Sequence, residues 1–161
     1  MRVSPAGWLY DDLETSLEVA RLVTDVTHNH PEGIKGAQAT AMAIFLARQG
    51  ESLQKIRERI QERFEYDLSR SVDQCRDEHV YNETCQICVP DSIICALDSE
   101  SYEDAVRSAV SLGGDADTLG AITGSIAEAI HGIPDDLIAK GQPFLDESFR
   151  PIIEEFYERN G

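Results

Sequence analysis

The amino-acid sequence predicts an all-α fold. Apolar residues recur at helical spacing along most of the chain, and capping residues or prolines precede several of these apolar stripes. No stretch of convincing length alternates between apolar and polar residues as a half-buried strand would. The chain has 161 residues, of which 42% are hydrophobic, and this length suits one domain with a real core. We therefore expect a single all-helical domain over residues 1–161.

The first predicted helix follows a pair of aspartates. Asp11 or Asp12 can cap a helix whose apolar stripe runs through Leu13, Leu17 and Ala20. The stripe repeats at three to four residues, so one face of this helix is expected to meet the core.

Two more helices are expected before residue 65. Residues 31–49 begin with proline, end before Gly50 and are rich in alanine, which predicts a helix central to the core. Ser52 can cap residues 53–64, where four apolar residues form one stripe beneath a face of arginines and glutamates. Residues 66–89 are polar and irregular, and we expect a long loop with one short helical turn.

The last part of the chain returns to helical spacing. Pro90 is expected to open a helix, and Ser101 to cap another with Asp104 in a capping box. Two glycines at 113–114 end that helix, and a further helix is expected over residues 116–130. Shorter helical pieces follow.

The four cysteines allow two interpretations. Cys75, His79, Cys85 and Cys88 are residue types that bind zinc, although the C-x3-H and C-x2-C pairs are closer together than in common zinc fingers. The alternative is that these residues and Cys95 are thiols, partly buried near a helix start.

The charge of the chain excludes two classes of partner. Thirty acidic and fourteen basic residues give a net charge of −16, which repels nucleic acid and anionic membranes. The sequence shows no apolar stretch long enough to span a bilayer and no signal peptide at its start. We expect a cytoplasmic protein with no nucleic-acid or membrane partner.

The segment SLGGDADTLGAITG places two carboxylates and a hydroxyl at the start of a predicted helix. Asp115 as N-cap and Asp117 in the first turn would stabilise that helix by capping alone. The same residues with Thr118 are hard oxygen donors suited to Mg²⁺ or Ca²⁺, and Gly113 and Gly114 allow the sharp turn that would let them converge. Three donors do not complete an octahedral site, so further oxygens would have to come from elsewhere.

Four segments, in order, resemble motifs of the ADP-ribosylglycohydrolases, which include the dinitrogenase-reductase-activating type. The last segment is very similar to the second metal motif of that family, G-G-D-x-D-T-x-A-A-x-x-G. The four segments of this chain are MRVSPAGW, THNHPEGIKGAQATA, ETCQICVPDSI and AVSLGGDADTLGAITGSIAEAIHG.

The resemblance implies a compact orthogonal helical bundle with two Mg²⁺ ions, or Mn²⁺ in some members. It implies hydrolysis of the glycosidic bond between ADP-ribose and an acceptor, and it assigns no catalytic acid or base in this chain. By analogy with the family, the expected site residues are Asp115, Asp117 and Thr118 as metal ligands, His28 beside the ADP-ribose, and Gly113 and Gly114 where the backbone approaches the ligand.

One family motif is absent. The Thr-Asp-Asp triplet that these enzymes carry near their N-terminus does not occur in the 161 residues, so the resemblance implies the C-terminal portion only. We expect such a chain alone to hydrolyse substrates slowly or not at all. The alternative is a non-catalytic module that binds ADP-ribose or another protein. A homodimer, or a complex with a separately encoded N-terminal half, would cover apolar surface on the helices at 31–49 and 116–130.

Overall fold

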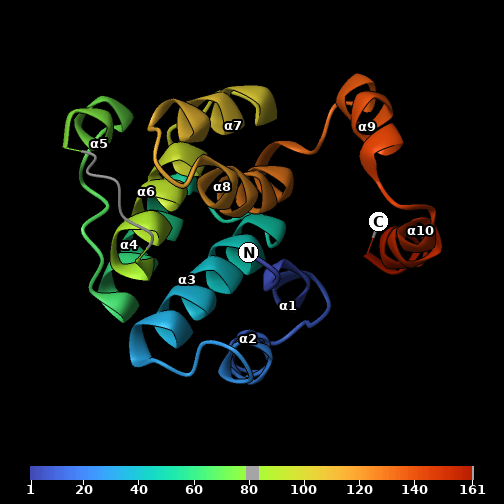
Figure 1. The fold of residues 1–161 in the computed structure, drawn as a ribbon. Coiled ribbons are helices and arrows are strands. Elements are labelled where there is room, and N and C mark those ends of the chain that lie inside the picture. Colours follow the sequence, from blue (N-terminus) through green and yellow to red (C-terminus); the bar gives the residue numbers. More distant parts are fainter. Residues whose placement is uncertain (79–83, 161) are drawn as a thin grey trace. The chain divides into compact units, whose positions relative to one another are not determined.

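The computed structural model describes residues 1–78 and 84–160, and every regular element within these ranges is a helix (Figure 1). The all-α prediction is confirmed. The α-helices are α1 (Ser4–Trp8), α2 (Leu13–Asp25), α3 (Pro31–Arg48), α4 (Leu53–Phe64), α5 (Val72–Glu78), α6 (Cys85–Leu97), α7 (Tyr102–Ser111), α8 (Ala116–His131), α9 (Asp135–Gly141) and α10 (Arg150–Asn160), and the 3-10 helices are η1 (Gln142–Phe144) and η2 (Glu147–Phe149).

The chain divides into two units, Met1–His131 and Gly132–Gly161. Unit 1 contains α1 to α8 and the buried core, whereas α9 and the two 3-10 helices of unit 2 have no buried residues. The expectation of a single domain over residues 1–161 stays a prediction. No helix in the described ranges is both long enough and apolar enough to cross a membrane.

Helix α3 is the central element of unit 1. It contacts α1, α2, α4, α6 and α8 (Figure 1). The reason lies in its composition, because small residues such as Ala39, Ala41 and Ala43 are fully buried and let neighbouring helices approach from several sides. The prediction of a central helix here is confirmed.

The expected caps explain where three helices begin. The carboxylate of Asp12 accepts from the backbone N–H of Thr15 at 2.8 Å, before α2. The hydroxyl of Ser52 accepts at the start of α4, and that of Ser101 at the start of α7. These side chains satisfy N–H groups that lack a partner inside the helix.

Helix α6 corrects the predicted start at Pro90. It begins at Cys85, after Thr84 in an extended conformation, and contains Pro90 within it. Proline removes one helical hydrogen bond, to the carbonyl of Gln86. Gln86 is exposed, so water can hydrate that carbonyl, while the continuous burial of residues 88–97 favours an unbroken helix.

The apolar residues of α3 and α8 lie largely inside unit 1. Residues 39–46 of α3 are buried, as are Leu119, Ile122 and Ile126 of α8. Neighbouring helices of this chain therefore cover most of the apolar surface that we expected to be bare. Self-association and binding of a separate N-terminal half stay predictions.

Candidate functional site

A glycine turn joins α7 to α8 and sets the position of the DADT motif. Gly113 and Gly114 have positive φ angles of 81° and 62°, a conformation that glycine adopts without the steric cost of a Cβ. The chain reverses there and enters α8, and the carbonyl of Asp115 accepts from the N–H of Leu119 at 3.0 Å. Asp115 therefore stands directly before the helix.

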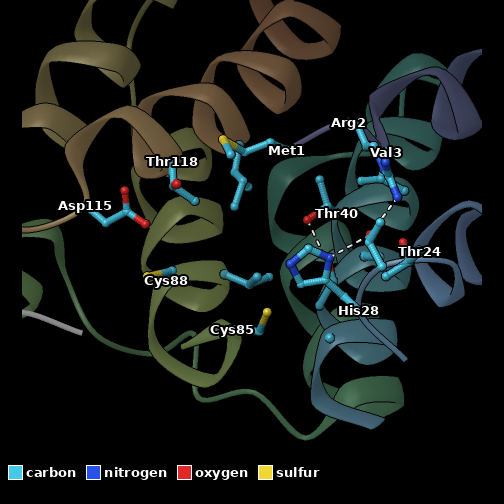
Figure 2. A pocket seen from close by; sticks show the side chains of 16 residues that line it. Met1, Arg2, Val3, Thr24, His28, Thr40, Cys85, Cys88, Asp115 and Thr118 are labelled. Carbon is cyan, nitrogen blue, oxygen red and sulfur yellow. Dashed lines mark hydrogen bonds between the residues drawn. The ribbon is translucent and has the colours of Figure 1, made fainter. Parts of the chain in front are cut away.

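The side chains of Asp115 and Thr118 line a pocket in unit 1. They are three residues apart at a helix start, so they share a face. Both are half-buried, whereas Asp117 is exposed and does not line the pocket. Figure 2 shows Asp115 and Thr118 on one side of the pocket and His28 on the other.

The two carboxyl groups of the motif interact with each other. A hydrogen bond with the Asp115 carboxyl holds the pKa of Asp117 below its usual range, and the backbone N–H groups of Thr118 and Asp117 act in the same direction. Two acidic side chains in hydrogen-bonding contact form an arrangement that a bound cation would stabilise.

The pocket has a volume of about 480 Å³, within the usual range for small-molecule sites. Its walls come from segments far apart in the sequence. The lining residues are Met1, Arg2 and Val3 ahead of α1, Thr24, Thr27 and His28 at the end of α2, Gly33, Gly36, Ala37 and Thr40 of α3, Cys85, Cys88 and Val89 of α6, and Asp115, Thr118 and Ile122 beside or within α8.

Three helices begin at this pocket. Gly33 lies in the first turn of α3, Cys85 is the first residue of α6, and Asp115 directly precedes α8. The N-terminus of a helix presents unpaired N–H groups and a partial positive charge. Their convergence, together with Arg2, makes the pocket suited to an anion despite the acidic composition of the chain.

His28 is held by its neighbours in the chain. The Thr27 hydroxyl lies 2.8 Å from His28 Nδ1, and the Arg2 guanidinium donates to the same hydroxyl at 2.6 Å. His30, by contrast, caps α3: its Nδ1 accepts from the N–H of Glu32 at 3.2 Å. The two histidines of the THNHP segment therefore have different roles.

The structure thus brings together three of the six predicted site residues, namely His28, Asp115 and Thr118. Gly113 and Gly114 shape the turn outside the lining. Arg2 and Thr27 were not among the predicted site residues, although both lie in segments that resemble family motifs. Their role depends on a contact between residues 25 positions apart, for which one sequence carries no signal.

The small residues of α8 have a structural role. A Cβ at Gly124 would lie 3.2 Å from the Tyr102 hydroxyl, and one at Gly120 would lie 3.7 Å from a Val110 methyl group. Both contacts are with α7. The contact at Gly124 is tight, so this glycine permits close packing of the two helices, whereas the position of Gly120 has room for a methyl group. The ligand pocket lies against other residues of α8.

Side chains that could bind a metal do not form a close cluster in the described part of the chain. Within residues 1–78 and 84–160, no three His, Cys, Asp or Glu side chains gather closely enough to hold a metal ion. His79, one residue of the zinc alternative, lies outside the described residues. Cys75, Cys88 and Cys95 are buried, and Cys85 is half-buried, in line with the interpretation as thiols.

Burial suppresses the reactivity of two of these thiols. It raises the pKa of Cys75 to about 11, with the nearby Asp91 carboxylate adding to the rise. It also raises the pKa of Cys95 to about 12. A protonated thiol is a poor nucleophile, so neither side chain should react near neutral pH.

We therefore expect iodoacetamide to modify Cys85 alone in the native protein, and all four cysteines in urea. Mass spectrometry of the digested protein identifies the modified cysteines. Native modification of Cys95 at a rate similar to that of Cys85 would contradict this assignment.

The same two thiols should make stability depend on pH. Thiols of the unfolded chain lose their protons from about pH 9, whereas Cys75 and Cys95 of the folded protein keep theirs to higher pH. The free energy of unfolding should consequently fall as pH rises from 9 to 11.

Comparison with known proteins places the chain in a family. A search of curated proteins finds no match. A family model described as ADP-ribosylglycohydrolase matches residues 1–160, which is nearly the whole chain and includes every lining residue of the pocket. The chain therefore belongs to the ADP-ribosylglycohydrolase family, a family of glycosidic hydrolases.

Proposed function

We propose that this chain forms an ADP-ribose site of a Mg²⁺-dependent hydrolase that cleaves the glycosidic bond between ADP-ribose and an acceptor. One observation carries the proposal. The carboxylate of Asp115, the hydroxyl of Thr118 and the imidazole of His28 line one pocket, at which three helices begin.

The chemistry of the pocket suits a diphosphate. The converging helix starts and the Arg2 guanidinium favour negative charge, and the volume of about 480 Å³ is of the order of a nucleotide-sized ligand. Val89 and Ile122 provide apolar wall on the α6 and α8 sides. An acidic protein can thus bind an acidic ligand, because the local field opposes the net charge.

The residues of the DADT motif provide some of the ligands that a hard cation needs. Two neighbouring acidic side chains, whose hydrogen bond lowers the pKa of Asp117, form with the nearby hydroxyl an all-oxygen donor set, which suits Mg²⁺ or Mn²⁺ better than a soft metal. Asp115, Asp117 and Thr118 would hold the ion, and water or ligand oxygens would fill the remaining positions.

Each group in the pocket has a task that follows from its chemistry. When bound, Mg²⁺ would orient water and hydroxyl groups and stabilise negative charge. The chain itself supplies the donors: Arg2 and the helix N-terminal N–H groups neutralise phosphate, and His28 offers a ring nitrogen to a ligand oxygen.

The metal assignment is tested by calorimetry with Mn²⁺. We expect Asp115→Ala and Asp117→Ala each to weaken binding by at least about tenfold, since each removes one anionic ligand. Asp135→Ala is the matched control, because Asp135 is also an exposed carboxylate in the first turn of a helix. Equal binding by the wild type and Asp117→Ala would remove the motif from the metal site.

The ligand assignment is tested by titrating ADP-ribose with and without Mg²⁺. His28→Ala should weaken ADP-ribose binding about tenfold and leave Mn²⁺ affinity unchanged. Release of ADP-ribose from an ADP-ribosylated protein then separates an enzyme from a binding module. Binding without release would favour the non-catalytic alternative, and neither binding nor release would refute the proposed function.

A further inference from the structure

His28 lies at the end of a chain of hydrogen bonds that begins at Arg2. The Arg2 Nη2 atom donates to the Thr27 hydroxyl at 2.6 Å and to the carbonyl of Val23 at 2.9 Å. The same hydroxyl lies 2.8 Å from His28 Nδ1. Figure 2 shows the imidazole inside the pocket, joined to this chain by dashed lines at one ring nitrogen, with the other nitrogen directed away from it.

The direction of each hydrogen bond follows from the donors available. A guanidinium donates and never accepts, so the Thr27 oxygen must be the acceptor toward Arg2. A threonine hydroxyl in a helical turn commonly donates to the carbonyl four residues back, which here belongs to Val23. In the described residues, however, the Thr27 hydroxyl makes its hydrogen bonds with Arg2 and His28 and none with that carbonyl. Its hydrogen is therefore left to His28 Nδ1.

A proton on Nδ1 would disturb this arrangement. The Thr27 oxygen has lone pairs for both donors, Arg2 and His28, but its own hydrogen would lose its acceptor among these residues. An unprotonated Nδ1 satisfies all three groups. The neutral ring then carries its proton on Nε2, the nitrogen on the pocket side.

We propose that Thr27 and Arg2 are positioning residues that fix neutral His28 in the Nε2–H tautomer. The imidazole therefore presents a hydrogen-bond donor to the pocket, and the ligand group that it meets must be an acceptor, such as a phosphate or hydroxyl oxygen. Only the identity of that ligand rests on the proposed function. The tautomer is a property of the protein without ligand.

The tautomer is measured by ¹⁵N NMR of the full chain labelled at histidine, in mildly alkaline solution where imidazole is neutral. Long-range ¹H–¹⁵N correlations distinguish a protonated from an unprotonated ring nitrogen, and His28→Gln assigns the signals. His30 is an internal reference, because its Nδ1 accepts from a backbone N–H and must be unprotonated. We expect His28 to show the same pattern as His30 in the wild type.

Variants of Thr27 and Arg2 test whether the hydrogen bond, rather than the intrinsic preference of the imidazole ring, sets the tautomer of His28. Thr27→Val should lower the ratio of Nε2–H to Nδ1–H by about fivefold, the effect of one net hydrogen bond. Thr27→Ser should restore it. Arg2→Met should lower the ratio as well, because the Thr27 oxygen, no longer engaged by a guanidinium, can then accept from Nδ1–H. Thr24→Val is the matched control, since Thr24 also lines the pocket and it is its backbone carbonyl, which the variant keeps, that accepts from the N–H of His28.

Two results would overturn the inference: a predominantly Nδ1–H ring in the wild type, or an unchanged ratio in Thr27→Val while the His30 pattern shows an intact fold. Neither result depends on ADP-ribose. Failure of the proposed function would instead be seen as a lack of ADP-ribose binding by a protein in which the tautomer is as expected.

Discussion

Replacement of Arg70 by methionine is expected to lower the free energy of unfolding by about 3–5 kcal/mol. Arg70 Nη2 lies 2.6 Å from an Asp91 carboxylate oxygen, and the Asp91 side chain is only 1% exposed. Removing the guanidinium would take away the cation that faces this buried carboxylate, and the cost of desolvating the charge would be offset less well. Asp91 belongs to α6, the helix that also carries Val89 of the pocket wall.

Urea unfolding followed by circular dichroism measures this effect. Arg107→Met is the matched control: Arg107 pairs with Glu103 on an exposed face, so its loss should change stability by less than about 0.5 kcal/mol. The double variant Arg70→Met, Asp91→Asn should recover part of the loss, since it removes the buried charge as well. A loss below about 1 kcal/mol for Arg70→Met would show that the carboxylate is better solvated than its burial indicates.

Addition of a single methyl group at Gly7, by Gly7→Ala, is expected to lower the free energy of unfolding by about 2–3 kcal/mol. Gly7 lies where α1 crosses α3, and a Cβ there would be 2.7 Å from Cβ and Cγ2 of Ile44 and 2.9 Å from the carbonyl oxygen of Ala41. Neither neighbour can turn aside, because one is a β-branched side chain at the fully buried Ile44 and the other is helix backbone. Gly7→Ala must therefore push α1 away from α3.

The control for Gly7→Ala is the same substitution at Gly120. A Cβ at Gly120 would meet only a Val110 methyl group at 3.7 Å, and alanine favours a helix interior. Gly120→Ala should leave stability unchanged or raise it by up to about 1 kcal/mol. Because residues 1–3 of the pocket lead directly into α1, Gly7→Ala should also weaken ADP-ribose binding. Equal stability of the two variants would mean that α1 does not pack on α3 in solution.

The elements that the sequence predicted well are those determined locally. Asp12, Ser52 and Ser101 each satisfy an N–H at the start of the next helix, and capping requires residues only a few positions apart. The start of α6 was misjudged because Pro90 is a strong local signal for a helix start. Burial of the surrounding residues against the rest of unit 1 outweighs that signal, and burial is not local information.

The same distinction applies to the site. Sequence spacing grouped Asp115, Asp117 and Thr118 as equals, but helix geometry places the first and third on the pocket face and leaves Asp117 exposed. His28 was expected beside the ligand only through the family resemblance. The bonds that hold it depend on how the segment ahead of α1 packs against the end of α2, which no local pattern specifies.

The mixed origin of the pocket walls has a consequence for the stage of folding at which the pocket forms. Residues from position 1 to position 122 must be assembled before any ligand can be bound, so no short fragment of the chain can carry the site and binding competence arrives late in folding. A ligand that binds only the assembled state stabilises all of it. At a ligand concentration one hundred times the dissociation constant, the free energy of unfolding rises by about 2.7 kcal/mol. Proteases that cleave the globally unfolded chain would then act more slowly even on helices of unit 1 that do not line the pocket, such as α4.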